Sequence, residues 1–80
     1  MNYVYILQSI DFPDRTYVGL ADDLRKRLAA HNAGQSSHTS KFKPWRLITY
    51  VAFSDKAKAV AFERYLKSGS GQAFAKKRLR

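Results

Sequence analysis

The sequence predicts an α+β fold, in which a small, three-stranded and mostly antiparallel sheet is flanked by helices in the order ββαβαα. Runs of β-branched and aromatic residues occur at three places, two of them before the first helical pattern. Segments with apolar residues at helical spacing follow the second and the third run. The 80 residues contain no internal repeat and no linker, and we therefore expect a single domain over residues 1–80.

The first two strands are expected to form a hairpin. Residues 3–7 and 16–20 have strand composition, and residues 11–14 between them contain a proline and two aspartates, which are typical of turns. The third strand is expected within residues 45–53. Its residues 47–53 are apolar enough to predict a central position in the sheet.

The first helix is expected to begin near Asp22, which can serve as its N-cap, and to end before Gly34 at the C′ position. Residues 35–44 are polar and basic and are expected to form a loop. A second helix should start at residues 54–55 and run to about Lys67, where residues 68–71 should break it. A short basic helix is expected over residues 72–79.

The charge of the chain points to a polyanionic partner. Fifteen Lys and Arg residues against six Asp and Glu residues give a net charge of +9, which favours nucleic acid ahead of a membrane. The absence of cysteine excludes disulfides. No stretch resembles a signal peptide or approaches the roughly 20 apolar residues that span a bilayer. We therefore expect a cytoplasmic protein with no membrane partner.

The first predicted helix carries charged residues on its apolar stripe. Helical neighbours recur at i, i+3, i+4 and i+7, and this stripe consists of Leu24, Arg27, Leu28 and His31. Because the leucines must pack, Arg27 and His31 are directed at the same place. A buried arginine is costly unless an anion meets it, so the stripe is a candidate site. The alternatives are an arginine that extends to solvent and a histidine that is satisfied in the core.

The second predicted helix has a carboxylate in its apolar stripe. Glu63 is the only glutamate in the chain. The apolar positions around it are Ala59, Phe62, Leu66 and, at the margin, Val60. An ionised carboxylate in this position requires a cation or a set of hydrogen-bond donors. The candidates are a metal ion and a structural ion pair with Arg27 or Arg64.

These residue types suit phosphodiester cleavage, which requires an activated water, a positive group on the phosphate and help for the leaving oxygen. A carboxylate can hold Mg²⁺, arginine is a rigid fork for phosphate, and tyrosine or histidine can orient a water or accept its proton. The chain offers Tyr5, Tyr17, Arg27, His31 and Glu63. The alternative for the two tyrosines is cross-strand packing in the hairpin.

In this order, the motifs resemble the GIY-YIG endonuclease domain. They are Tyr-Val-Tyr at residues 3–5, Tyr-Val-Gly at residues 17–19, Leu-x-x-Arg-Leu-x-x-His at residues 24–31, and Glu63 in Ala-Phe-Glu-Arg-Tyr-Leu-Lys. The resemblance covers nearly the whole chain. It is to the small single-domain bacterial members, which are related to the nuclease domain of the excision-repair incision subunit.

The resemblance implies a role for each matching residue. Tyr5 and Tyr17 match the tyrosines that surround the attacking water, one of which acts as a base. Arg27 matches the phosphate-stabilising arginine, and His31 a histidine that shares the proton transfer. Glu63 matches the ligand of a single divalent metal ion, magnesium or manganese.

The resemblance also covers a motif glycine and has two departures. Gly19 matches the glycine whose missing side chain lets strand and helix come close. The first motif lacks its leading glycine. Several family members use an asparagine after the glutamate, and this chain has none after Asn32. Gln72 could replace it, although its position does not single it out.

Two basic segments are candidates for nucleic-acid contact. Residues 36–46 interleave hydroxyls, bases and aromatics, which suit phosphate contact and base stacking. We expect Trp45 in the core, and Lys41, Lys43 and Arg46 on phosphates. The basic residues 76–80 are either a second electrostatic contact or a solvated tail.

The leading functional expectation is a metal-dependent endonuclease that acts on DNA rather than RNA. We expect it to select its substrate by structure rather than sequence, in DNA repair or recombination. One alternative is a catalytically silent nucleic-acid-binding module. The other is a nuclease subunit of a larger assembly, although the sequence does not indicate a protein partner.

Overall fold

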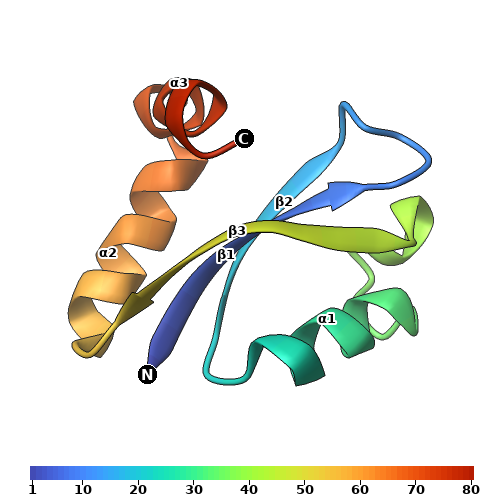
Figure 1. Cartoon of the computed structure of the whole chain (residues 1–80), viewed down its shortest axis with the longest axis horizontal. Coiled ribbons are helices and arrows are strands. Elements are labelled where there is room, and N and C mark those ends of the chain that lie inside the picture. Colours follow the sequence, from blue (N-terminus) through green and yellow to red (C-terminus); the bar gives the residue numbers. More distant parts are fainter.

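The computed structural model describes residues 1–80 and has one sheet with helices on both faces (Figure 1). The predicted α+β class and the order ββαβαα are confirmed. None of the helices combines the length and the apolar character that a membrane span requires. The elements are β1 (Asn2–Ser9), β2 (Thr16–Ala21), α1 (Leu24–Asn32), the short 3-10 helix η1 (Ser40–Phe42), β3 (Trp45–Phe53), α2 (Lys56–Lys67) and α3 (Gly69–Arg78).

The sheet is antiparallel throughout and has the strand order β2-β1-β3. The predicted central position of the third strand is wrong, because β1 is central and its residues 4–7 are each only 1% exposed. The edge strand β3 leaves Tyr50 53% exposed. It is nevertheless apolar because it packs on both faces of the sheet: Ile48 and Phe53 contact one core and Leu47 the other.

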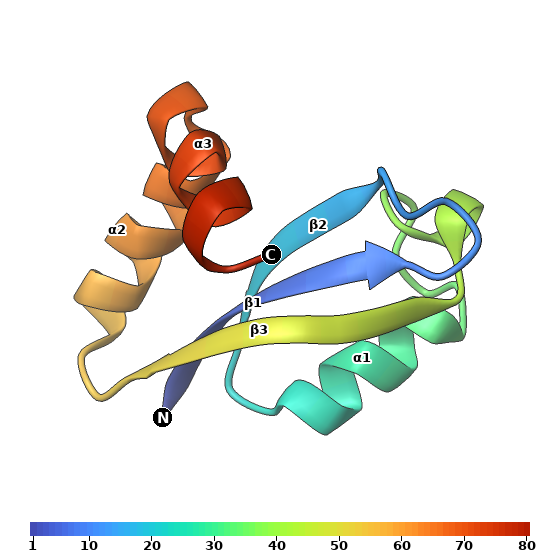
Figure 2. The same cartoon turned by 45° about the horizontal axis from the view of Figure 1, so that its top comes forward.

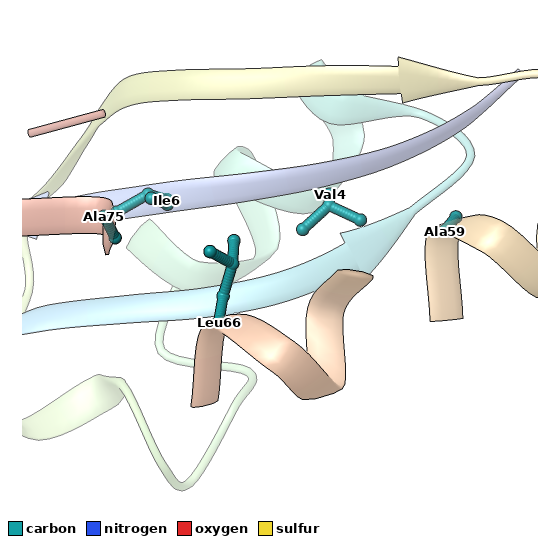
Figure 3. Packing of buried hydrophobic residues seen from close by; sticks show 5 residues of the cluster. All are labelled: Val4, Ile6, Ala59, Leu66 and Ala75. Carbon is teal, nitrogen blue, oxygen red and sulfur yellow. The ribbon is translucent and has the colours of Figure 1, made fainter. Parts of the chain in front are cut away.

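Alternate side chains of β1 point to opposite faces of the sheet, as pleated strands require. Helices α2 and α3 cover one face and α1 lies on the other (Figure 2). The first face carries an apolar core, in which side chains of β1 point toward the two helices (Figure 3). This core consists of Val4, Ile6, Ala59, Leu66 and Ala75. On the α1 face the buried core consists of Tyr5, Leu7 and Trp45.

Helix α1 begins one residue later than predicted. Asp23, not Asp22, is the N-cap, and its carboxylate accepts a hydrogen bond from the Lys26 amide at 3.1 Å. Gly34 follows the C-cap with φ of 77°, in the left-handed conformation that glycine tolerates best. The predicted C′ position of Gly34 is therefore confirmed.

The junction between α2 and α3 is tighter than predicted. Asp55 caps α2 as expected, with its carboxylate 2.8 Å from the Ala57 amide. The predicted break over residues 68–71 is wrong in extent, because only Ser68 interrupts the helices and its hydroxyl caps α3. A Cβ on Gly71 would lie 1.7 Å from the Tyr65 carbonyl oxygen. This glycine serves the close approach of the helices rather than ending one.

Candidate active site

The hydroxyl of Tyr5 joins two predicted site residues of α1. It lies 2.9 Å from His31 Nε2 and 3.4 Å from Arg27 Nε. Arg27 and His31 are four residues apart, so both reach over the same part of β1. The prediction that these two residues point to the same place is confirmed.

Gly19 leaves space for the ring of Tyr5, its partner in the β1–β2 pairing. A Cβ at this position would lie 2.3 Å from the Tyr5 hydroxyl oxygen, which is closer than any side chain allows. The resemblance implied a close approach of strand and helix here. The atoms nearest to Gly19 belong instead to a side chain of the neighbouring strand.

The imidazole of His31 has a hydrogen-bond partner on each nitrogen. Its Nδ1 lies 2.6 Å from Thr39 Oγ1, and its Nε2 bonds Tyr5. Burial, and secondly the charge of Arg27, lowers the pKa of His31 and favours the neutral ring. A neutral imidazole has one donor and one acceptor, so the bonds run in one direction along Tyr5, His31 and Thr39.

Thr39 is a site residue that the sequence did not reveal. It lies in the loop whose hydroxyls were expected to contact phosphate, but it is fully buried. Trp45, in the core as predicted, donates its indole N–H to the Thr39 carbonyl at 2.8 Å. The Asn32 side chain bonds the backbone of Trp45 at 2.6 and 3.1 Å. These bonds fix Thr39 against His31, and nothing in the sequence separates Thr39 from its neighbouring hydroxyls.

Tyr17 and Arg27 are the members of this group that solvent reaches. The half-buried Tyr17 ring lies 5.0 Å from the His31 ring and 6.4 Å from the Tyr5 ring. Arg27 is exposed, which agrees with the alternative of an arginine that extends to solvent. It lines an open groove with His31 and Ser36. Tyr5, and to a smaller extent Tyr17, raises the pKa of Arg27.

Tyr5 differs from Tyr17 in its access to solvent, since only 1% of Tyr5 is exposed. Burial raises the pKa of Tyr5, although its hydrogen bond from Arg27 opposes this effect. The buried phenol therefore keeps its proton at neutral pH.

Glu63 of α2 is linked to Tyr17 through Lys67. Its carboxylate lies 2.8 Å from Lys67 Nζ, which lies 5.9 Å from the centre of the Tyr17 ring. The predicted ion-pair partners, Arg27 and Arg64, are wrong, because the partner is the lysine one turn further along the helix. Glu63 raises the pKa of Lys67. The i,i+4 spacing was the signal in the sequence that could have identified this pair.

Glu63 is a donor of the kind that magnesium prefers. Its side chain is 20% exposed, and no group of three or more His, Cys, Asp or Glu side chains could hold a metal ion. Such a donor set does not suit zinc, which takes three or four protein ligands. It does suit magnesium, which keeps several waters and needs only one or two carboxylates together with substrate phosphates.

The three predicted phosphate-binding residues are exposed but lie in different places. Arg46 donates to Gln8 Oε1 from Nη2 at 2.6 Å and from Nε at 3.2 Å. The ammonium group of Lys41 lies 5.8 Å from the centre of the Phe42 ring. Lys43 lies beside Gly34 at the end of α1.

Known proteins are similar to this chain in sequence and in fold. Residues 1–78 match the family model described as the GIY-YIG catalytic domain. A UPF0213 protein of Streptococcus pyogenes serotype M3 is 36% identical over 66 residues, which cover 81% of this chain and 70% of the relative. The solution NMR structure of a UPF0213 protein from Bacillus halodurans is similar with a TM-score of 0.57 and 30% identity, over 99% of this chain and 87% of that one.

A further relative is the structure-specific endonuclease subunit SLX1 homolog of Giardia intestinalis. It is 35% identical over 65 residues, which are 76% of this chain. The matched part is only 18% of the length of the Giardia protein.

Proposed function

This chain belongs to the GIY-YIG family, and, taking it as a GIY-YIG-type endonuclease, we propose that it hydrolyses phosphodiester bonds in DNA with one divalent metal ion. The observation that carries the proposal is the convergence of Arg27 and His31 on the Tyr5 hydroxyl, next to Tyr17. This cluster lies at the sheet edge that Glu63 reaches through Lys67. Each chemical requirement of phosphodiester cleavage thus has a candidate group.

Arg27 is the proposed ligand of the scissile phosphate. Its guanidinium is exposed, so a phosphate can reach it, while the bond from its Nε to Tyr5 fixes its direction. A preorganised positive group stabilises the charge that develops on the phosphate oxygens in the transition state. Arginine also offers further N–H groups for a second bond to the phosphate.

Tyr17 is the proposed partner of the attacking water. It is the site tyrosine that solvent reaches, whereas Tyr5 and His31 are each 1% exposed. The raised pKa of Tyr5 also argues against its use as a base. We therefore assign Tyr5 and His31 as positioning residues, which hold Arg27 and Tyr17 in place.

Glu63 is the proposed metal ligand, on the strength of its position and its oxygen donors. A divalent ion, magnesium or manganese, would supply positive charge for the leaving oxygen. Lys67, one helical turn further along α2, bonds the carboxylate with an ammonium group that lies 5.9 Å from the centre of the Tyr17 ring. A solvent-accessible ion pair of this kind costs little to open.

We propose that selectivity depends on DNA structure, and that the cellular role lies in repair or recombination. Residues 1–78 are accounted for by the catalytic-domain model, and none of them is assigned to a sequence-reading module. The Giardia relative is named as a structure-specific endonuclease subunit. Its name also favours a second candidate, in which this chain is the nuclease subunit of an assembly.

The test is cleavage of a panel of end-labelled DNAs (duplex, single strand, flap and junction) with Mg²⁺ or Mn²⁺. Glu63→Gln keeps the size of the side chain and removes its charge, so it should abolish cleavage without changing the melting temperature. The matched control is Arg64→Gln on the exposed neighbouring position, which should cleave like the wild type. Near wild-type cleavage by Glu63→Gln would overturn the metal assignment. DNA binding without any cleavage by the wild type would favour the silent module.

A further inference from the structure

A second groove begins at Tyr17 and leads away from the site along the edge strand β2. Its first part, of about 330 Å³, has Tyr17, Lys67 and Arg80 among its lining residues. Its second part, of about 410 Å³, includes Lys76 and Arg80. Asp14, Thr16 and Arg80 line both parts, so the two parts are adjacent. We call the two parts together the β2 groove.

The far end of the β2 groove is cationic. Lys76 and Arg80 line it, and Arg46 extends the row because it bonds Gln8 in the groove wall at 2.6 Å. None of these three cations is in a salt bridge, since the one ion pair of the molecule joins Glu63 and Lys67. The lining contains one carboxylate, that of Asp14. Arg15 also lines the first part of the groove, and its guanidinium lies 4.9 Å from the centre of the Phe42 ring.

The cations are held in place rather than carried on a loose tail. Arg80 Nη1 donates to Thr16 Oγ1 of β2 at 3.0 Å. The Thr49 hydroxyl of β3 donates to the carbonyl of Leu79, whose side chain packs against the apolar core. The chain end that follows α3 is therefore fixed to the sheet on both sides of β1, and Arg80 has a defined position beside β2.

We propose that the β2 groove binds the sugar-phosphate backbone of the DNA strand on one side of the scissile bond. The proposal rests on the proposed function. Arg27 and His31 line one groove of the site, and Tyr17 lines the β2 groove. The rings of His31 and Tyr17 lie edge to face with their centres 5.0 Å apart, so the two grooves are close to each other at the site. A strand whose phosphate meets Arg27 and whose path crosses Tyr17 thus enters the β2 groove.

The chemistry of the groove suits phosphates better than a protein. The wall of the second part contains no large apolar side chain that could anchor a protein partner. It offers instead the hydroxyl of Thr16, the amide of Gln8 and two cations, which are the groups that contact phosphate oxygens. Lys41 and Lys43 line neither part of this path.

The test is DNA binding measured by fluorescence anisotropy in EDTA, which prevents cleavage, over a series of salt concentrations. The double variant Lys76→Gln/Arg80→Gln should bind more weakly. Its log–log salt slope should be flatter by about 1.4–1.8 units, since each phosphate contact contributes about 0.7–0.9. The matched control Lys77→Gln/Arg78→Gln removes the same charge from the same C-terminal segment outside the groove, and should keep the wild-type slope. The variant Lys76→Gln/Arg46→Gln leaves the Arg80–Thr16 bond intact and should repeat the flattening if Arg80→Gln unfolds the chain.

Equal flattening in the groove and control variants would overturn the proposal, because only total charge would then matter. A larger loss in Lys41→Gln/Lys43→Gln would also overturn it and place the strand over the loop of residues 33–44. The cleavage assay separates this proposal from the proposed function. If the wild type cleaves DNA and the salt slope of Lys76→Gln/Arg80→Gln is unchanged, the proposed role of the β2 groove is wrong and the proposed nuclease function stands. If that slope is flattened but the wild type does not cleave, the β2 groove binds DNA and the proposed nuclease function is wrong.

Discussion

The two faces of the sheet bury side chains of the same strand to the same degree but with different chemistry. Ile6 points to α2 and α3, and Tyr5 points to α1; both are 1% exposed. The neighbours of Ile6 are apolar. Tyr5 is instead bonded to Arg27 and His31, and His31 to the buried Thr39.

This difference shows how a small domain separates stability from chemistry. A buried polar group costs free energy unless it has a hydrogen-bond partner. No buried side-chain nitrogen or oxygen in this protein lacks one. The α1 face can therefore hold a buried polar network, while the buried cluster on the opposite face is apolar.

The largest effect on stability should come from Ile6→Ala. Truncation of a buried isoleucine removes apolar burial and leaves a cavity, which costs about 2–5 kcal/mol of unfolding free energy. Cleavage per folded molecule should remain, because Ile6 faces away from the site. Urea denaturation measures the free energy of unfolding, and a single-turnover assay measures cleavage per folded molecule. Ile10→Ala, which truncates a side chain that is 52% exposed, is the control and should change stability by less than about 0.5 kcal/mol. Full loss of cleavage by folded Ile6→Ala would break the separation of the two faces.

Gly19→Ala should have the reverse pattern. The added methyl group would lie 2.3 Å from the Tyr5 hydroxyl, so the ring must move away from Arg27 and His31. We expect a large loss of cleavage, and a destabilisation of about 1–3 kcal/mol from overpacking. Gly69→Ala adds the same group where nothing lies within 4 Å and should keep both properties. Unchanged cleavage by Gly19→Ala would mean that the position of Tyr5 is not important for the reaction.

The smallest expected effect is a pH dependence of stability, which His31 should contribute on the α1 face. Because the folded pKa of His31 is lowered, the unfolded chain binds more protons near and below the ordinary histidine pKa of about 6.5. His31 therefore contributes stability that is complete above pH 6.5 and is lost as the pH falls toward the folded pKa. His31→Gln should flatten the decrease of the urea midpoint between pH 7 and pH 5. The exposed His38, changed in the same way, is the control. Identical pH dependence of His31→Gln and the wild type would contradict a buried neutral imidazole.

The local patterns of the sequence predicted most of the elements. Helical spacing brought Arg27 and His31 together, and Asp55 and Gly34 identified helix ends correctly. These predictions succeeded because capping and helical periodicity act over a few residues. The family motifs then related Tyr5 and Tyr17 to the same site, as the ring distance of 6.4 Å shows.

The features that the sequence did not predict depend on contacts between distant segments. The central position of β1 follows from its pairing with both other strands, and a single apolar run does not reveal that. Gly71 is a helix breaker by propensity, but the nearby Tyr65 carbonyl leaves room for no other residue. Thr39 became part of the site only because Asn32 and Trp45 hold its loop against α1.

The central claim is that the solvent-reachable Tyr17, supported by a buried Tyr5–His31 pair, acts on the attacking water. The most direct measurement is the single-turnover rate of Tyr17→Phe at saturating DNA, together with its DNA affinity in EDTA. The ring stays and only the hydroxyl is removed, so we expect a rate loss of about 100-fold or more, the range of general-base effects, with affinity nearly unchanged. Tyr65→Phe, on a tyrosine that is 42% exposed, should keep the wild-type rate. A Tyr17→Phe protein that cleaves like the wild type, while His31→Gln loses the rate and its dependence on pH, would contradict the claim and identify the histidine as the base.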